Sequence, residues 1–487
     1  SQTRRQAYRR TANILKEEKS QMKKFLSLVL ALVMTMSLVT VSAGAKDFTD
    51  DSEITYKEAV DVISALGVVD GYSGGDFRPD DVLTRGAAAK IICNLILGPT
   101  TASALNAGTA PFKDVPVTNT FAGYITYCSQ QGIISGYADG TFRPTGTLSG
   151  NAFMKMLLGA LGYDSSIEGY TGPNWQVSVI KQASGIGLDD GNDEFVGSQA
   201  VTRQEAALYA FNMLQATMVE YDKKDTIVVG GVEITSTSTR KEVENPIEKD
   251  NTIEKDEKMQ FAERYFDDLQ KAPGEADDFG RPSNIWTLKS DEIGTYANMD
   301  QLVGTYTAKV SKSDVYEAVG RTVYNDLTDG KSDLTVWFDG VETPVKTADV
   351  EDYVERNNTG AVNNTANGDL TEIYVDDDTN DVTIVTVRTY VFQAASDYDT
   401  RKETVSLTTD SSKYDTDITL DSRTLDVDDF ANITDLKADD YVLVTAVNNN
   451  SRYEVKSIDK AEVVNGTVEG YKDGSNAVSY THLTLPT

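Results

Sequence analysis

The sequence contains little histidine and little cysteine, which narrows the chemistry open to it. Its 487 residues include one histidine, His482, and two cysteines, Cys93 and Cys128. His482 stands in a C-terminal segment that we interpret as foreign to the protein. Without it, Ser-His-Asp and Cys-His catalysis, histidine-ligated zinc and histidine-based pH switching are excluded. The cysteines occupy apolar positions and are interpreted as core residues, and a disulfide between them stays open.

Positive charge is also scarce. The chain has 45 Lys and Arg against 76 Asp and Glu, which gives a formal net charge of −31. Nucleic-acid binding requires clustered Lys and Arg, so the composition argues against nucleic acid as a partner. A chain this acidic stays soluble through self-repulsion and attracts cations.

One long apolar run stands near the N-terminus. Residues 22–45 have the pattern of a secretory signal peptide, with basic residues at 23–24, an apolar stretch at 25–41 and small residues at 43–45. We therefore predict an exported protein that has no membrane contact after the signal is cleaved. Residues 1–21 precede the methionine that begins this signal, and we interpret them as a non-native upstream segment.

A glycine-rich loop recurs three times along the chain. The fullest copy is residues 132–144 (GIISGYADGTFRP), an earlier copy is residues 67–79 (GVVDGYSGGDFRP), and a worn copy is residues 185–195 (GIGLDDGNDEF). Each copy lies between two runs whose apolar residues recur at helical spacing, which predicts a helix–loop–helix unit. One such unit is too small to bury both apolar faces, so a stack of units is expected.

This pattern resembles the S-layer homology (SLH) repeat of bacterial cell-surface proteins. The second copy has the opening motif at residues 112–115 (FKDV) and the loop motif at 142–144 (FRP). The third copy has residues 201–205 (VTRQE), similar to the Thr-Arg-Ala-Glu motif of the family. The first copy keeps part of that motif at 83–87 (LTRGA), and the second has lost it at 148–151 (LSGN).

The resemblance implies a multidomain α+β protein. An N-terminal all-α bundle of three SLH repeats would form a pseudo-trimer with grooves between neighbours, and β-rich modules would follow. We expect residues 48–220 to fold as one helical unit without the rest. The predicted domains are SLH repeat 1 at 46–99, repeat 2 at 111–164, repeat 3 at 170–220, a hairpin with a charged linker and short helix at 221–289, β-rich surface modules at 290–477 and a foreign tail at 478–487.

Repeats of this family bind secondary cell-wall polysaccharide, typically through its pyruvate-ketal groups. A ketal carboxylate is a planar anion that a guanidinium meets with two parallel hydrogen bonds, and a helix start adds N–H groups and a positive dipole end. The resemblance implies that the glycan-binding residues are Tyr72, Thr84, Arg85, Tyr137, Thr202, Arg203 and Glu205.

Each of these residues also has a structural interpretation. Threonine is favoured at helix N-caps, and an arginine is often a solvated surface charge. Arg203 lies in the only copy that also keeps a glutamate, Glu205, which would hold the guanidinium or a glycan hydroxyl. Wall binding is therefore expected to depend on Arg203 first and on Arg85 second.

One position departs from this pattern, and two further arginines lie in the loops outside the motif. Gly150 occupies the place of the motif arginine in the second copy, so its groove is expected to be weak or inactive. Arg78 and Arg143 precede prolines in the loops, and we expect them to be structural residues that bond loop carbonyls.

An acidic run at residues 376–381 suggests a weak Ca²⁺ site, whose ligands would be Asp376, Asp378 and Asn380. The run lacks the glycine and the final glutamate of an EF-hand, and a polar hairpin turn is the favoured alternative. No other cofactor is expected.

These observations favour a non-enzymatic protein of the bacterial cell wall or S-layer. The repeats would anchor it to pyruvylated wall polysaccharide, and the β-rich region would serve as S-layer, adhesin or spacer material. Assembly with further copies of itself in a lattice stays open. One alternative is an SLH-anchored glycan or wall hydrolase that uses carboxylates. Another is that the repeats have drifted to a purely structural role.

Overall fold

The protein divides into two compact units. The structure is a computed structural model that describes the backbone of residues 48–222, 226–229, 232–235, 238–245, 252–254, 256–427, 429–461, 467–468, 471–474, 477–480 and 483–484. The N-terminal unit comprises the described residues up to Asp277 together with Pro282–Asn298, and the C-terminal unit comprises Asp278–Arg281 and the residues from Met299 onward. The predicted upstream segment and signal peptide lie outside the described residues, as do the side chains of the predicted tail.

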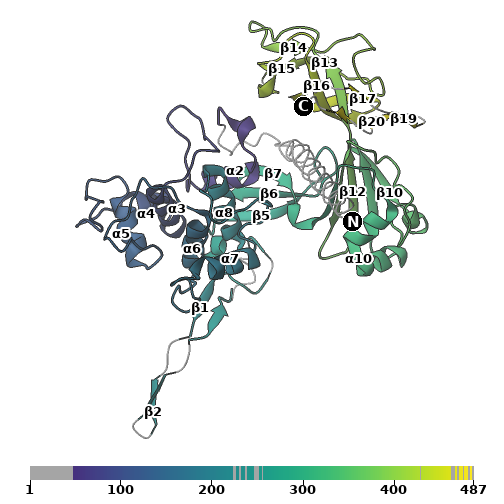
Figure 1. Ribbon diagram of the computed structural model, residues 1–487. Helices are drawn as coiled ribbons and strands as arrows, with labels where there is room; N and C mark the ends of the chain where they lie inside the picture. The colour runs from purple at the N-terminus through teal and green to yellow at the C-terminus, as the bar shows by residue number, and fades with distance from the viewer. Residues whose placement is uncertain are drawn as a thin grey trace, which may run out of the picture. The chain divides into compact units, whose positions relative to one another are not determined.

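Helices dominate the first part of the N-terminal unit (Figure 1). They are η1 (Asp51–Glu53), α2 (Lys57–Ala65), α3 (Arg85–Leu97), α4 (Pro99–Ser103), α5 (Ala122–Gln130), α6 (Gly150–Ala160), α7 (Trp175–Gly185), α8 (Arg203–Gln215) and α9 (Phe261–Tyr265). The first copy of the loop joins α2 to α3, the second joins α5 to α6, and the third joins α7 to α8. Across the copies, α3 packs on α5, α6 on α7, and α8 on α2, so the three helix pairs are in cyclic contact.

Three backbone hydrogen bonds close this cycle. The N–H of Leu83 donates to the carbonyl of Val201 (2.8 Å), the N–H of Val201 donates to Leu148 (2.9 Å), and the N–H of Leu148 donates to Leu83 (3.1 Å). Each residue stands two positions before a helix start, and all three side chains are buried. The segments before α3, α6 and α8 are therefore held in equivalent positions around one centre.

The helix ends correct the predicted alignment of the third copy. Gly67 and Gly132 follow α2 and α5 in the left-handed region, with φ of 69° and 72°, where glycine is favoured. In the third copy the equivalent residue is Gly187, with φ of 72°, whereas the sequence alignment had used Gly185. In the third copy, the segment from this glycine to the loop phenylalanine is thus two residues shorter than in the other two copies.

A three-stranded antiparallel sheet completes the core of the N-terminal unit. Its strands, in the order β5-β6-β7, are Leu269–Gly274, Ser283–Leu288 and Asp291–Ala297. Trp286 on β6 is fully buried with its ring edge-on to Phe211 of α8, at 5.3 Å between centroids. Its Nε1 donates to Glu58 of α2 at 2.7 Å. The helical bundle and this sheet therefore share one hydrophobic core.

A buried polar group ties the same sheet to α2. The Tyr296 hydroxyl on β7 donates to Asp61 Oδ2 at 2.7 Å, and Lys57 Nζ donates to Asp61 Oδ1 at 2.6 Å. Burial raises the pKa of the Asp61 carboxyl, although both partners oppose the shift. The compact unit runs to Asn298, so the predicted boundaries at 220 and 290 are wrong: the later residues provide partners for groups on α2 and α8.

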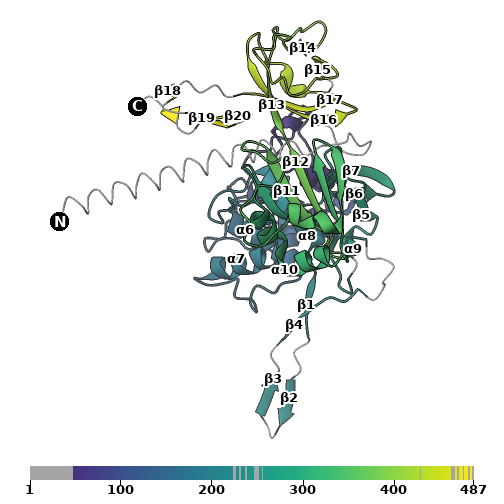
Figure 2. The ribbon, with the colours of Figure 1, turned by 90° about the vertical axis from the view of Figure 1, so that its right-hand side faces the viewer.

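The predicted hairpin after the helices is confirmed. Strand β2 (Thr226–Val229) pairs with β3 (Val232–Thr235), with Val229 opposite Val232. Strand β1 (Val219–Tyr221) pairs with β4 (Arg240–Glu242), and Figure 2 shows both pairs one after the other. The short helix predicted in this region is α9.

The C-terminal unit begins with a mixed sheet in the order β10-β9-β12-β11-β8. Its elements are η2 (Met299–Gln301), β8 (Leu302–Tyr306), α10 (Lys312–Thr328), β9 (Leu334–Phe338), β10 (Val341–Val345), η3 (Thr347–Asp352), β11 (Leu370–Val375) and β12 (Val382–Val387). Only β9 and β12 are parallel among these pairs, and α10 packs on β8 and β11. The mixed α and β class is confirmed, but this region carries the helical segment α10, interrupted at Gly320 by non-helical backbone (φ 77°, ψ 172°), which the β-rich prediction omitted.

A second antiparallel sheet follows, in the order β13-β16-β17. The remaining elements are β13 (Thr389–Gln393), β14 (Thr404–Ser406), β15 (Thr424–Asp426), η4 (Ala431–Ile433), β16 (Tyr441–Asn449), β17 (Arg452–Lys460), β18 (Thr467–Val468), β19 (Tyr471–Gly474), β20 (Ala477–Tyr480) and β21 (Leu483–Thr484). Strand β14 pairs with β15, β18 with β21, and β19 with β20.

The two sheets of the C-terminal unit meet at a buried aspartate in the β9–β10 turn. Asp339 Oδ1 accepts the Arg388 N–H at 2.9 Å, and Oδ2 accepts the Tyr390 hydroxyl at 2.7 Å. Its carbonyl also accepts the Asn448 N–H at 2.8 Å. Burial raises the pKa of Asp339 to about 6, although these donors oppose the shift.

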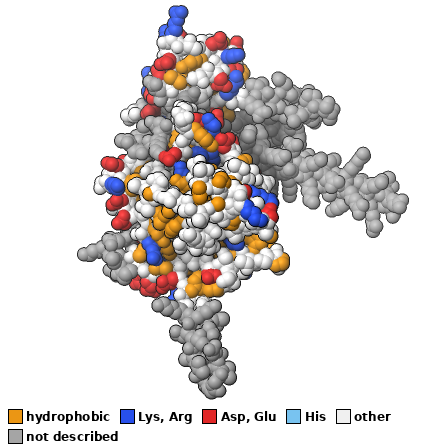
Figure 3. Space-filling view, turned by 90° about the vertical axis from the view of Figure 1, so that its left-hand side faces the viewer, with side chains coloured by type: hydrophobic (Ala, Val, Ile, Leu, Met, Phe, Trp, Pro, Cys, Tyr) orange, Lys and Arg blue, Asp and Glu red, His pale blue; other side chains and the backbone are white. Residues whose placement is uncertain are grey.

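Among the residues that the structure describes, no helix combines the length and apolar character needed to span a bilayer. On the face drawn in Figure 3, acidic and basic side chains lie in small groups among hydrophobic ones. This mixed surface is the one expected of a charged chain facing water.

We expect residues 48–298 to unfold cooperatively and residues 48–220 to be markedly less stable, because the shorter fragment exposes Phe211 and removes Tyr296, which donates to the buried Asp61 carboxyl. In the longer fragment, Trp286→Ala should lower the free energy of unfolding by about 3–5 kcal/mol, while Val177→Ala, at a 71% exposed position, should be nearly neutral. Thermal melts followed by circular dichroism test this. Equal melting temperatures for the two fragments would refute the shared core.

We also expect the C-terminal unit to gain stability as pH falls. Because the folded-state pKa of Asp339 lies near 6, above its ordinary value of 3.8, the folded state binds a proton more readily than the unfolded state between these values. The stabilisation should appear as pH falls through about 6 and reach on the order of 2–3 kcal/mol near pH 4. Asp339→Asn should remove this component. Urea unfolding of the full chain at several pH values measures it, and identical pH profiles for both proteins would contradict it.

Candidate functional site

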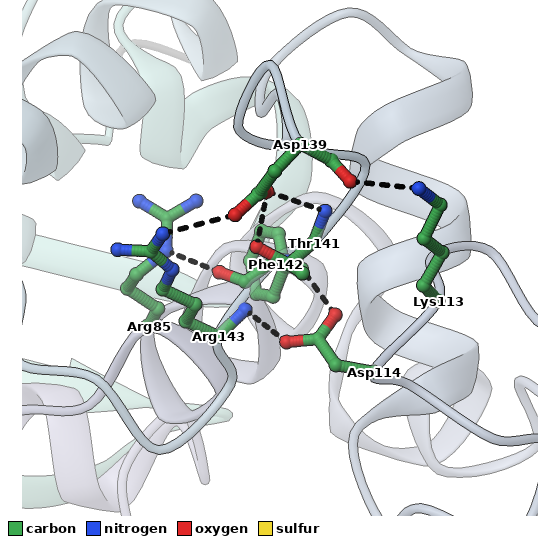
Figure 4. A network of polar contacts seen from close by, with 7 residues as sticks. All are labelled: Arg85, Lys113, Asp114, Asp139, Thr141, Phe142 and Arg143. Atoms are coloured by element: carbon green, nitrogen blue, oxygen red, sulfur yellow. Dashed lines mark hydrogen bonds and ion pairs between the residues drawn. The ribbon is translucent and has the colours of Figure 1, made fainter.

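Arg85, the first residue of α3, lies against the loop of the second copy. Its Nε donates to the Phe142 carbonyl at 2.8 Å, and its Nη2 donates to the Ser135 carbonyl at 3.1 Å. The guanidinium carbon lies 4.4 Å from the centroid of the Phe142 ring and 5.0 Å from that of Tyr137. Figure 4 shows Arg85 beside Arg143 at this loop.

Arg143 brings a second guanidinium to the same tyrosine. Its guanidinium carbon lies 4.1 Å from the Tyr137 centroid, and its Nη2 donates to Asp139 Oδ2 at 3.1 Å. The side chain is 56% exposed. We call Arg85, Tyr137 and Arg143 the first cluster. It presents two cations and one aromatic face at a helix start, which suits a planar anion attached to a sugar.

A partly buried aspartate, Asp114, accepts hydrogen bonds from the loop that carries Arg143. Asp114 Oδ1 accepts the Phe142 N–H and Oδ2 accepts the Arg143 N–H, both at 2.7 Å (Figure 4). Desolvation raises the pKa of Asp114, but these two N–H donors outweigh it and hold the pKa below the ordinary value. Arg143 has φ of 59°, so the aspartate holds it in the left-handed region that it would otherwise seldom adopt.

The same arrangement occurs between the third and first copies. Arg203, the first residue of α8, donates from Nε to the Phe77 carbonyl at 2.9 Å and from Nη2 to the Asp70 carbonyl at 2.8 Å. Its guanidinium carbon lies 4.8 Å from the Tyr72 centroid, and that of Arg78 lies 4.1 Å from the same ring. Arg78 also bonds Asp76. We call Arg203, Tyr72 and Arg78 the second cluster.

The equivalent position between the second and third copies has no guanidinium. Gly150 begins α6, and a Cβ placed there would lie 2.7 Å from Cε2 of Phe195. Val196, which is 47% exposed, stands where the other loops carry Arg143 and Arg78. We call this the third position, and its weak binding stays a prediction.

The predicted threonines are N-caps. Thr84 Oγ1 accepts the Ala87 N–H at 3.2 Å, and Thr202 Oγ1 accepts the Glu205 N–H at 3.3 Å. Glu205 Oε2 in turn accepts the Thr202 N–H at 2.7 Å, which completes a capping box. The Glu205 carboxylate thus belongs to the capping box, while the Arg203 guanidinium bonds loop carbonyls. A contact of Glu205 with a glycan hydroxyl stays a prediction.

The first N–H groups of these helices are also occupied. The Arg85 N–H donates to the Gly146 carbonyl at 2.9 Å, and the Arg203 N–H donates to the backbone carbonyl of Asp81 at 2.9 Å. The expectation that free helix-start N–H groups would meet a ligand is thus not supported. Any recognition at these helix starts has to use side chains.

The two pairs of arginines differ in role. Arg78 and Arg143 were expected to bond loop carbonyls, which is wrong: they bond carboxylates and lie on tyrosine rings, with their side chains 51% and 56% exposed. Arg85 and Arg203 bond the loop carbonyls instead, and burial lowers the pKa of each. Sequence reasoning therefore missed the two more accessible of these four guanidiniums, although the Phe-Arg-Pro motif contains both.

The weak Ca²⁺ prediction falls on a hydrogen-bonded turn. Asp376 Oδ1 accepts the Asp378 and Thr379 N–H groups at 3.0 and 2.9 Å, and Oδ2 accepts Gln301 Nε2 at 2.9 Å. Asn380 Nδ2 donates to Asp326 Oδ2 at 2.9 Å. These contacts are typical of a polar hairpin turn, and no cluster of three or more candidate ligands occurs among the described residues. Calcium binding here stays a prediction.

Comparisons with known proteins bear on the repeats. The family model for the S-layer homology domain matches residues 47–89 and 111–150. The chain is 23% identical to a middle cell wall protein of Brevibacillus brevis over 66% of its own length and 29% of that protein. It is 29% identical to a surface layer protein of Brevibacillus choshinensis over 36% of its own length and 15% of that protein.

A further relative is an endoglucanase of a Bacillus species, 32% identical over 20% of this chain and 11% of that enzyme. The chain thus spans less than a third of the length of each of these relatives. The third copy, with α7 and α8, lies outside the segments that the family model matches.

We expect Arg85→Ala and Arg203→Ala each to destabilise the N-terminal unit, because each removes two hydrogen bonds from a charged donor to backbone carbonyls of a neighbouring loop. The expected loss is on the order of 1.5–3 kcal/mol per substitution. Arg143→Ala is the matched control and should change stability little, because its ion pair is exposed. Urea unfolding of the chain measures the differences. If Arg85→Ala is as stable as Arg143→Ala, the hydrogen bonds from Arg85 to the neighbouring loop do not stabilise the unit.

Proposed function

We propose that this chain, an S-layer homology domain protein by its two matched segments, is a cell-surface protein held non-covalently to secondary cell-wall polysaccharide. It acts outside the cell, in the wall or S-layer of a bacterium. The observation that carries the proposal is the repetition of one arrangement: two guanidiniums on one tyrosine, at the start of a helix, in both the first and second clusters.

The proposed ligand group is the carboxylate of a pyruvate ketal on the polysaccharide. In each cluster the inner arginine, Arg85 or Arg203, uses Nε and Nη2 on loop carbonyls and keeps the rest of its guanidinium for the ligand. The outer arginine, Arg143 or Arg78, is more than half exposed. The half-exposed tyrosine ring between them gives the sugar a flat apolar surface.

We further propose that residues 170–220 are a third SLH repeat. The cyclic helix contacts and the three backbone hydrogen bonds at Leu83, Leu148 and Val201 support a bundle of three equivalent copies. The third position would then be a structural neighbour contact without a ligand. Two clusters on one bundle would bind two carboxylates of the same polysaccharide, and the paired attachment raises the overall affinity.

The C-terminal unit is proposed to project as S-layer, adhesin or spacer material, including contacts with further copies of itself. The endoglucanase relative keeps a carboxylate-dependent hydrolase as the second hypothesis. A depression of about 600 Å³ in this unit is lined by Asp278, Glu342 and Glu454. Lys456 Nζ lies 2.7 Å from a carboxylate oxygen of Asp278 and 2.7 Å from one of Glu454. Two of the three carboxylates are thus engaged by one lysine, and this pairing favours the non-enzymatic proposal.

We expect Arg78→Ala and Arg143→Ala together to reduce pelleting with purified bacterial cell walls by on the order of tenfold to a hundredfold in affinity, because each removes a charge-assisted contact. Arg203→Lys should also bind poorly, since an ammonium lacks the planar fork. Arg452→Ala, an exposed arginine of the C-terminal unit, is the matched control and should pellet like the parent chain.

Walls from which the polysaccharide has been removed chemically complete the experiment. The parent chain should stay in the supernatant with these walls. If the double variant pellets like the parent, the anchoring residues lie elsewhere on the chain. If the parent still pellets with the stripped walls, its partner is a different wall component.

A further inference from the structure

The two cysteines of the chain face each other across the contact between the first and second copies. Cys93 lies on α3 and Cys128 on α5, and both side chains are fully buried. Their Sγ atoms are 3.4 Å apart. These are the only two cysteines in the 487-residue sequence, and they lie next to each other. A disulfide bond, with sulfurs about 2.05 Å apart, requires these two sulfur atoms to move closer together.

The reduced form is accommodated at the same place. Cys93 Sγ lies 3.6 Å from the Tyr124 carbonyl, and Cys128 Sγ lies 3.6 Å from the Ala89 carbonyl. Each carbonyl is one turn before the facing helix's own cysteine, so each thiol sits over the partner helix. The fold therefore tolerates the thiol pair, and the oxidation state depends on the conditions under which the chain folds.

We propose that Cys93 and Cys128 are a modification site, at which a disulfide bond joins α3 to α5 when the chain folds outside the cell. This proposal rests on the extracellular location given above. The oxidant is a small-molecule or protein disulfide. One cysteine thiolate attacks a sulfur of the oxidant, which forms a mixed disulfide and releases one thiol. The second cysteine then attacks the bound cysteine sulfur and releases the second thiol, so two electrons and two protons pass to the oxidant.

Burial decides when this exchange takes place. The hydrogen bond with Cys93, together with desolvation, raises the pKa of the Cys128 thiol far above its ordinary value. The thiolate is the reactive form, and neither sulfur is open to an oxidant in the folded unit. Exchange must therefore precede the packing of α3 on α5 or follow its transient opening. A chain that folds in a reducing medium should keep both thiols.

The bond would restrain the linkage between the first two copies. It closes a loop of 35 residues that contains α4 and the segment leading to the second copy. Closing such a loop restricts the unfolded chain more than the folded one. The disulfide also lies on the helix whose first residue, Arg85, belongs to the first cluster, so it would hold that helix against the copy that supplies Tyr137 and Arg143.

The test uses the full chain refolded from denaturant in two ways, with a glutathione disulfide buffer and with excess reductant. Each product is denatured and alkylated with iodoacetamide without prior reduction, and its mass is measured. We expect no added alkyl groups on the oxidised product and two on the reduced product. The oxidised product should melt higher by on the order of 5–10 °C. In Cys93→Ala/Cys128→Ala the two refolding conditions should give one melting temperature.

A second arm adds the same disulfide buffer to the folded, reduced chain. Slow oxidation that speeds up in subdenaturing urea is expected, because opening must come first. Two alkyl groups on the product refolded with glutathione disulfide would overturn the proposal, and so would equal melting temperatures for the oxidised and reduced parent chains. Wall pelleting of both forms is measured in parallel, so that loss of the disulfide and loss of anchoring are distinguished.

Discussion

The ring of backbone hydrogen bonds at Leu83, Leu148 and Val201 is the constraint from which the N-terminal unit is built. Each residue donates to one neighbour and accepts from the other, so the three segments are linked to one another through backbone atoms. Two residues later each segment begins a helix. The first residue of that helix is thereby placed against the loop of the next copy, which is where Arg85 and Arg203 find the carbonyls that they bond.

This arrangement separates the work of the arginines. The inner pair, Arg85 and Arg203, connects one copy to the loop of another and is half-buried, so its charge serves the scaffold as well as any ligand. The outer pair, Arg78 and Arg143, depends on Asp50 and Asp114, which accept the loop N–H groups and hold these arginines at positive φ. Each cationic surface therefore has the same composition: one arginine from a helix start and one from the loop of the neighbouring copy.

The sequence predicted the local elements better than their partners. Helix period, loop glycines and motif residues identified the helix pairs, because these signals lie within a few residues of one another. The burial of Trp286 on Phe211 was not predictable, since an alternating strand pattern does not say which surface it covers. The role of Glu205 was also missed. Its position three residues after Thr202 fits a capping box, but the sequence analysis assigned the carboxylate to the guanidinium of Arg203 or to a glycan hydroxyl. The approach of Cys93 to Cys128 also depends on how two copies pack.

The third position shows how the helix start keeps its backbone contacts where the two arginines are missing. The N–H of Gly150 donates to the Gln199 carbonyl at 2.9 Å, the same kind of bond that Arg85 and Arg203 make at their helix starts. These bonds use backbone atoms, so replacing an arginine with glycine leaves them intact. Phe195 fills the space beside Gly150, where a Cβ would collide with its ring. The scaffold and the cationic clusters are therefore separable: the backbone hydrogen bonds link the segments before α3, α6 and α8, while each cluster depends on the side chains of two arginines and a tyrosine.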